Sequence, residues 1–175
     1  SNITEFHLST FINPTELDLQ EEAVICINRV SKATTGGRSM RFNSVVVVGD
    51  GKGHVGLGFG KANEVASAVN KARENAKKSI FKVTLINGTI PHRIDIKFSS
   101  VRLMLKPASP GTGIIAGGPV RAIMEQLGIT NILSKNTGST NAINMVKAVA
   151  YGLKTLRDPL TVARQRGITL KELFT

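Results

Sequence analysis

A run of four valines, Val45–Val48, followed by a glycine-rich turn over residues 49–53, restricts the possible fold more than any other feature of the sequence. β-Branched side chains favour strands, and a strand without polar alternation fits a sheet that is covered on both faces. The glycines and the Asp50-Gly51 pair supply the positive φ angles that a tight hairpin turn requires. The pattern therefore predicts a buried strand over residues 42–48 that returns through this turn into a strand over residues 54–60.

The segments on either side extend this unit. Residues 23–30 are apolar and β-branched and predict a preceding strand. Ser31–Arg38 combines two glycines with hydroxyl and basic side chains and predicts an exposed loop between the first two strands. Apolar residues then recur at three- and four-residue steps from Val65 to Ile80, which predicts a helix over residues 62–81. We expect a three-stranded antiparallel sheet with one helix on one face.

The second half of the chain predicts a separate α+β unit. Strands are expected over residues 83–86, 93–97, 101–105 and 131–134, with a turn at Asn87-Gly88. Gly118-Pro119 opens a helix that Gly128 ends, and Ser139–Asn141 caps a last long helix. The predicted fold class is thus α+β, divided into an arm over 1–19, a first domain over 20–83, a second over 84–160 and a helical tail over 161–175.

Charge identifies the class of partner. The chain carries 23 Lys and Arg against 12 Asp and Glu, a net charge of +11. The excess of positive charge lies in both predicted domains. Residues 1–19 contain three acidic residues and no Lys or Arg. A polyanion is therefore expected, either nucleic acid or an anionic membrane surface. No apolar run approaches the roughly 20 residues of a spanning helix and no signal peptide is visible, which favours nucleic acid. The single cysteine, Cys26, suits a reducing cytoplasm and is interpreted as a buried, inert thiol.

The sequence contains short matches to nucleotide-binding motifs, but the elements predicted around them differ from those such sites require. Gly51–Gly56 matches G-x-G-x-x-G, but a strand follows it where a dinucleotide site needs a helix. Gly111–Ala116 lies between a strand and a helix, yet no acid follows about twenty positions later to hold a ribose. The three histidines are far apart and lack metal-ligand spacing. We expect no catalytic site, no cofactor and no metal.

The basic residues instead predict an RNA surface. Several surround the glycine-bearing loop, where backbone amides and guanidinium groups are open to phosphate. Others lie on the predicted outer face of the helix, namely Lys71, Arg73, Lys77 and Lys78. The few aromatic residues (seven Phe, one Tyr, no Trp) argue against base stacking and favour reading of backbone and shape. The candidate RNA-binding residues are Arg29, Lys32, Gly36, Gly37, Arg38, Arg41, Lys52, Lys61, Lys71 and Lys78.

Several sequence blocks resemble one known family. From about residue 20 to 174, blocks in matching order and spacing are similar to the family of ribosomal protein five of the bacterial small subunit. They include Asn28–Lys32, Gly36–Arg38, Val47–Gly51, Val55–Ala62, Asn87–Thr89, Pro107–Ser109, Gly111–Gly118 and Gly138–Asn141. The resemblance implies a first domain like a double-stranded-RNA-binding fold and a second α+β domain with a βαβ crossover.

The same resemblance implies function and partners. It implies a structural protein of the small ribosomal subunit in the cytoplasm that binds rRNA near the neck and central pseudoknot. Expected neighbours are ribosomal proteins four and eight and mRNA at its entry path, with effects on subunit assembly, decoding accuracy and spectinomycin response. Relatives often carry further basic residues in the first loop, where this chain has Ala33, Thr34 and Thr35. The resemblance therefore implies RNA contact at Arg29, Lys32 and Arg38 more strongly than at the tip of the loop. A free RNA-binding regulator and an NTP-binding enzyme remain as alternatives.

Overall fold

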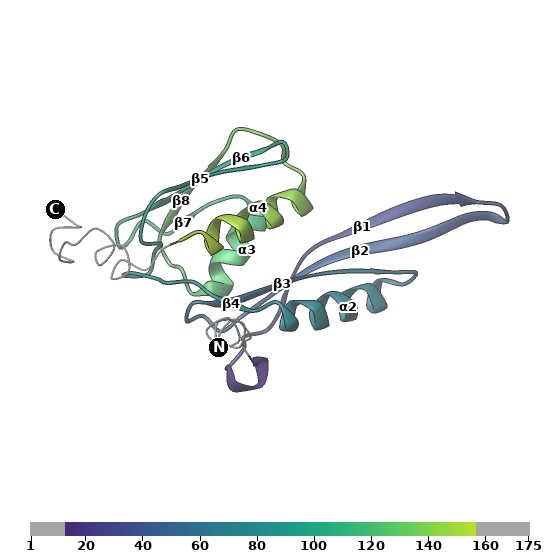
Figure 1. Cartoon of the computed structure of the whole chain (residues 1–175), viewed down its shortest axis with the longest axis horizontal. Coiled ribbons are helices and arrows are strands. Elements are labelled where there is room, and N and C mark those ends of the chain that lie inside the picture. Colours follow the sequence, from purple (N-terminus) through teal and green to yellow (C-terminus); the bar gives the residue numbers. More distant parts are fainter. Residues whose placement is uncertain (1–12, 157–175) are drawn as a thin grey trace, which may run out of the picture.

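The computed structural model describes residues 13–156. The first part of the expected arm and the whole of the expected tail over 161–175, with its short helices, lie outside the described residues. Figure 1 shows four layers: helix α2, a first sheet, helices α3 and α4, and a second sheet. The elements are η1 Pro14–Glu16, β1 Ala23–Thr34, β2 Gly37–Gly49, β3 His54–Ala62, α2 Val65–Lys78, β4 Phe81–Lys82, β5 Ile94–Phe98, β6 Val101–Pro107, β7 Ile114–Ile115, α3 Gly118–Leu127, β8 Ile132–Asn136 and α4 Ala142–Lys154.

The valine run lies in the middle of the first sheet, as predicted. The strand order is β1-β2-β3-β4, and all neighbours are antiparallel. Val45 and Val47 belong to the large core that also contains the second sheet and both later helices. Val46 and Val48 face the other way, into a small cluster with Ala72, Ala76 and Ile80. The first sheet is therefore covered on both faces, by the predicted helix α2 on one and by the second half of the chain on the other.

Helix α2 lies directly against strand β3 because neither surface carries large side chains at the contact. Gly56, Gly58 and Gly60 repeat at the two-residue period of one strand face. A Cβ atom built on Gly58 would lie 1.9 Å from the carbonyl oxygen of Ala72, and those on Gly56 and Gly60 would each lie 2.2 Å from a helix carbonyl oxygen. The facing helix positions are alanines with 0% exposure, Ala68, Ala72 and Ala76. The alternating glycines thus allow contact between a strand and a helix backbone.

The glycine-rich turn between β2 and β3 caps helix α3. The backbone N–H of Gly51 donates to the carbonyl of Gln126 at 3.0 Å, and that of Gly53 donates to Leu127 at 2.9 Å. These carbonyls are at the C-terminal end of the helix, where no intrahelical donor is available. Gly128 ends the helix at φ 88°, as predicted, and a Cβ there would lie 2.0 Å from the carbonyl oxygen of Gly51. The turn thereby joins the first sheet to the second half of the chain.

The second sheet has the order β5-β6-β8-β7. β7 and β8 are parallel and α3 connects them, so the βαβ crossover is present. The two-residue strand β7 was not predicted from the sequence. The strand expected over residues 83–86 was wrong: β4 comes earlier, at Phe81–Lys82, and pairs with β3. Ile86 forms only an isolated bridge with Thr89 around the Asn87-Gly88 turn.

Two further expectations need correction. Helix α2 is shorter than predicted, because β3 continues to Ala62 and the helix begins only after Glu64. Val65, assigned to its apolar stripe, is 41% exposed. Cys26 is half-buried at the edge of the core and not fully buried. Burial still raises the pKa of its thiol from 9.0, so the thiolate is disfavoured at neutral pH.

Candidate nucleic-acid interface

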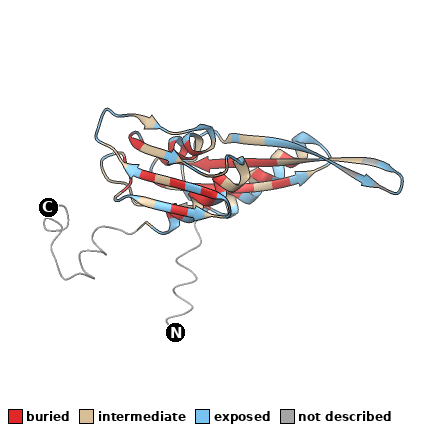
Figure 2. Ribbon diagram, turned by 90° about the horizontal axis from the view of Figure 1, so that it is seen from above, coloured by how far each residue is buried: buried red, intermediate tan, exposed pale blue. Residues whose placement is uncertain are grey.

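The first two strands form a long ribbon that projects beyond the body of the protein. Their pairing runs without a break from Cys26↔Val45 to Thr34↔Gly37, and only Thr35 and Gly36 lie in the turn. The loop predicted over residues 31–38 was therefore wrong: most of it is strand, because each extended segment satisfies its backbone groups on the other. Figure 2 shows that the outer half of this hairpin is mainly exposed, whereas its root lies in the core.

The ribbon carries cations and no anions. Residues 23–49 contain Arg29, Lys32, Arg38 and Arg41 but no Asp or Glu. Arg29 and Arg41 are exposed and lie in neighbouring register pairs, Arg29↔Phe42 and Val30↔Arg41. The neighbouring sulfur of Met40 accepts a hydrogen bond from the Arg29 guanidinium at 2.9 Å. Lys32 and Arg38 follow toward the tip, opposite Ser39 and Ala33 respectively. The fold thus gathers these four candidate residues on a single ribbon.

The two glycines of the hairpin tip have different conformations. Gly36 lies in the turn at negative φ, whereas Gly37 pairs with Thr34 at φ 131°. That value is rarely open to residues with a side chain, so Gly37 allows the chain to reverse within two residues. A Cβ atom on either glycine would meet nothing within 4 Å. Both glycines are exposed, so there is room for a ligand beside the tip.

Three other candidate residues meet between β3 and α2. Lys61, Lys71 and Lys78 line a hollow of about 450 Å³ together with one acid, Glu74. The Lys71 ammonium donates to the Lys61 carbonyl at 3.3 Å. All three lysines are exposed. This hollow is a second cationic surface, beside the part of β3 that β4 does not pair with.

Arg73 behaves differently from its neighbours on the helix. The sequence placed it with Lys71, Lys77 and Lys78 on an outward face, but Arg73 is half-buried and lies 2.5 Å from the carboxylate of Glu22. The same guanidinium donates to the side-chain carbonyl of Asn70 at 3.1 Å. Its charge is thus used to connect α2 with the segment that precedes β1.

Lys52 lies apart from the other candidates. It stands in the β2–β3 turn, at the opposite end of the 13-residue strand β2 from Arg38. At about 3.4 Å per residue the two positions are roughly 40 Å apart along the strand. The Lys52 side chain is exposed, and its backbone N–H donates a hydrogen bond to the Asp50 carboxylate within the turn. The ten candidate residues therefore divide into the hairpin, the β3–α2 hollow and this single lysine.

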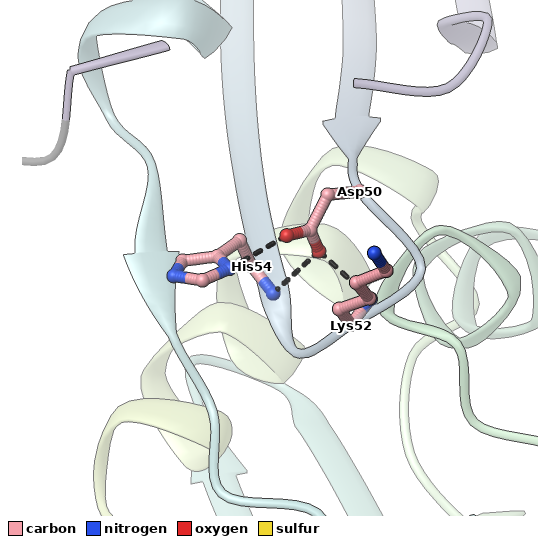
Figure 3. A network of polar contacts seen from close by, with 3 residues as sticks. All are labelled: Asp50, Lys52 and His54. Atoms are coloured by element: carbon pink, nitrogen blue, oxygen red, sulfur yellow. Dashed lines mark hydrogen bonds and ion pairs between the residues drawn. The ribbon is translucent and has the colours of Figure 1, made fainter. Parts of the chain in front are cut away.

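A buried carboxylate holds the β2–β3 turn in shape. Figure 3 shows Asp50 accepting hydrogen bonds from the backbone N–H groups of Lys52 and His54, at 2.8 and 3.1 Å, and contacting the His54 ring nitrogen at 2.7 Å. Burial of the carboxylate works to raise its pKa, but these two backbone donors and His54 outweigh it, so the pKa of Asp50 is lowered from 3.8. The ionised form therefore stabilises the folded turn.

The sequence interpretation missed one cationic surface on the second sheet. Its outward positions alternate with buried apolar residues, for example Arg102 between Val101 and Leu103. This period of two was visible in the sequence, but which strands lie side by side was not. The exposed cations of this face are Lys97, Arg102, Lys106 and Lys135.

Two observations on residues 13–156 concern metal ligands and membrane-spanning helices. No group of three His, Cys, Asp or Glu side chains there could hold a metal ion. No helix in the same part of the chain is long and apolar enough to cross a bilayer. The G-x-G-x-x-G match at Gly51–Gly56 enters strand β3, so no helix N-terminus is available there for a pyrophosphate.

The fold and these surfaces define a basic, two-sheet α+β protein of the kind that contacts a polyanion. Comparison with known sequences gives the family: residues 20–84 match the description "Ribosomal protein S5, N-terminal domain", and residues 96–166 match "Ribosomal protein S5, C-terminal domain". The chain belongs to the ribosomal protein S5 family.

Relatives named "Small ribosomal subunit protein uS5" are similar over most of their length. One from Dehalococcoides mccartyi is 50% identical over 161 residues, which is 92% of this chain and 93% of the relative. One from Thermotoga neapolitana is 52% identical over 154 residues, 88% and 86% of the two chains. One from Chloroflexus aurantiacus is 49% identical over 163 residues, 93% and 91% respectively.

Proposed function

We propose that this chain is a structural protein of the small ribosomal subunit that binds rRNA through the β1–β2 hairpin and the β3–α2 hollow. Such a protein works in the ribosome, in the cytoplasm, and catalyses no reaction. The observation that carries the proposal is the hairpin: an exposed ribbon with four cations and no acid, projecting from a root that is fixed in the core. Cations held away from carboxylates can all be used to neutralise phosphates.

The mode of recognition follows from the side chains on these surfaces. The hairpin offers the exposed guanidinium groups of Arg29 and Arg41, and the hollow offers lysine ammonium groups. The hollow contains one aromatic residue, Phe59, which is only partly exposed. Phosphate contacts position a protein on RNA without reading bases. We therefore expect binding to folded, double-stranded rRNA with a steep dependence on salt.

A pair of arginines in the described part of the hairpin provides the test. Arg29→Gln with Arg41→Gln removes two exposed charges outside the core. The slope of log K against log salt for an rRNA neck fragment should become shallower by roughly 1.8, from about 0.9 per duplex contact. The matched control, Lys82→Gln with Arg121→Gln, removes two exposed charges elsewhere and should leave the slope close to wild type. Equal slopes in all three proteins would refute the role of the hairpin.

The finer placement rests on the resemblance of the sequence blocks. We propose contact with rRNA near the neck and central pseudoknot, neighbours equivalent to ribosomal proteins four and eight, and a position beside the mRNA entry path. Effects on assembly, decoding accuracy and spectinomycin response follow from that placement. Subunits that carry the Arg29→Gln, Arg41→Gln protein should differ from wild type in spectinomycin sensitivity and misreading. An unchanged response to both would argue against this placement while leaving RNA binding open to the salt test.

A further inference from the structure

A groove between the end of the first sheet and helix α4 is lined by apolar and aromatic side chains that are open to solvent. Its volume is about 440 Å³. The first sheet contributes Leu57, Phe59 and Phe81, and α4 contributes Ala150 and Tyr151. Tyr151 is 59% exposed, the largest fraction among the large hydrophobic residues of the described chain. Such a surface fits an apolar ligand.

Two lysines of α4 give the groove its charge. Among the described residues that line it, Lys147 and Lys154 alone are charged. The Lys147 ammonium lies 5.3 Å from the centre of the Phe59 ring, and the Lys154 ammonium lies 5.0 Å from that of Phe81. Both distances suit a cation–π contact. Neither lysine forms an ion pair with any residue from 13 to 156. The groove therefore fits a segment that brings apolar side chains together with negative charge.

The first twelve residues of the chain have this composition. They contain one acid, Glu5, and no Lys or Arg. Their large apolar residues are Ile3, Phe6, Leu8, Phe11 and Ile12. The segment at the other end, residues 157–175, carries four bases against two acids, so the lysines of the groove repel it. Charge complementarity thus selects the N-terminal segment of the chain.

The described part of the chain brings this segment close to the groove. Leu17 and Leu19 pack against the small cluster on the first sheet that includes Ile80. Ser79 and Phe81, the two sequence neighbours of Ile80, line the groove. An extended segment of twelve residues spans up to about 40 Å. Residues 1–12 are therefore long enough to follow the groove from the first sheet to α4.

We infer that residues 1–12 fold back over this groove and place the Phe6 and Phe11 side chains against its aromatic floor. A small contact suffices, because a segment on a short tether acts at an effective concentration on the order of millimolar. RNA fits the groove less well, since stacked bases need open ring faces and the two ammonium groups cover one face of each phenylalanine beneath them. The inference concerns the free chain and does not depend on the proposed RNA-binding function.

The fluorescence of Tyr151 provides the test in the full chain. The sequence contains one tyrosine and no tryptophan, so emission excited in the tyrosine band reports on this residue. At low salt the acrylamide quenching constant of wild type should be about half that of a Phe6→Ser, Phe11→Ser variant, because a docked segment excludes water from the ring. The matched control, Thr4→Ser with Thr10→Ser, changes the same segment without removing its phenylalanines and should behave as wild type.

Charge and proximity are tested separately. Lys147→Gln with Lys154→Gln, at two exposed positions, should raise the quenching constant toward that of the phenylalanine variant. Added salt should raise it in wild type, because screening weakens the attraction between the segment and the groove. Benzoylphenylalanine in place of Phe6 should cross-link within one chain to a peptide of α4. Unchanged thermal unfolding would verify that the variants are folded.

Each result supports or overturns the inference. Equal quenching constants in wild type and the Phe6→Ser, Phe11→Ser variant overturn it, as does a cross-link that forms only outside the groove. A constant that falls as the protein concentration rises shows that a second copy covers the groove, which also overturns it. If an rRNA neck fragment protects Tyr151 equally in wild type and in this variant, RNA occupies the groove and the inference fails. Failure of the hairpin variant in the salt test would change none of these results, so the two proposals fail independently.

Discussion

Replacing Gly58 by alanine should separate helix α2 from the first sheet. The new Cβ atom would lie 1.9 Å from the carbonyl oxygen of Ala72, whereas real Cβ contacts are not shorter than 3.0 Å. The deficit is 3.0 − 1.9 = 1.1 Å. Both the strand and the helix meet there through their backbones, so no side chain can rotate away. The helix must move by about 1 Å or the strand must bend.

The cost can be estimated from that displacement. Overpacking in a core costs about 1–3 kcal/mol, and a rigid backbone contact belongs at the upper end. Loss of glycine flexibility in the unfolded chain returns about 0.4–1 kcal/mol. We therefore expect Gly58→Ala to reduce the free energy of unfolding by about 2 kcal/mol. For a protein of this size the midpoint of thermal unfolding should fall by roughly 4–8 °C.

Chemical and thermal unfolding followed by circular dichroism measure this change. The control is Gly36→Ala in the turn of the β1–β2 hairpin, where a Cβ meets nothing within 4 Å and φ is not positive. Its stability should equal wild type or exceed it slightly. A second variant, Gly58→Ala with Ala72→Gly, should not recover stability, because the obstacle is the carbonyl of residue 72 and not its methyl group. Recovery in that variant, or a loss below about 0.5 kcal/mol in the first, would refute the reasoning.

Three further outcomes are expected. Gly128→Ala, at φ 88° with a Cβ 2.0 Å from the Gly51 carbonyl oxygen, should destabilise by about 1–3 kcal/mol more than Gly113→Ala, which has a similar φ of 80° in open space; equal losses in unfolding experiments would mean that only the φ angle matters. Asp50→Ala should cost about 1–3 kcal/mol at pH 7, and because the folded pKa is lowered from 3.8, wild type should lose this advantage as pH falls below about 4; parallel stability–pH curves would contradict it. Cys26 should react with a thiolate-directed reagent more slowly in the folded than in the unfolded chain, since burial raises its pKa; equal rates would show the thiol to be open.

Local signals in the sequence predicted the elements that depend on neighbouring residues. The valine run gave the central strand, and Gly128 marks the end of α3 through its own φ angle. Asn141 caps α4 by accepting a hydrogen bond from the backbone N–H of Asn144, three positions away. Each of these features is decided within a few residues, so a single sequence contains the information.

Features that depend on distant partners were missed or wrong. Residues 31–34 have hydroxyl and basic side chains typical of a loop, but residues 37–40 pair with them and make them strand. Gly56, Gly58 and Gly60 of β3 were visible in the sequence only as part of a sequence block. The structure shows why glycine is needed there: any side chain would collide with backbone carbonyl oxygens of helix α2. The sequence analysis assigned Lys52 and Arg38 to one basic surface, yet the length of β2 separates them. Register and close approach are tertiary facts that composition does not contain.

The packed layers at the root of the hairpin determine where its basic side chains lie. Beyond residue 28 the ribbon has no core of its own: Val30 is 43% exposed, and an isolated two-stranded hairpin is at best marginally stable in water. Its direction is therefore set at the root, where Val45–Val48 are fixed between α2 on one face and the second half of the chain on the other. The close contact at Gly58 and the cap at Gly51 hold these two faces. Substitutions at such glycines change no charge, but they alter where the cations of the hairpin lie. The position of the proposed RNA-binding surface thus depends on uncharged residues such as Gly58, which is buried at the root of the hairpin.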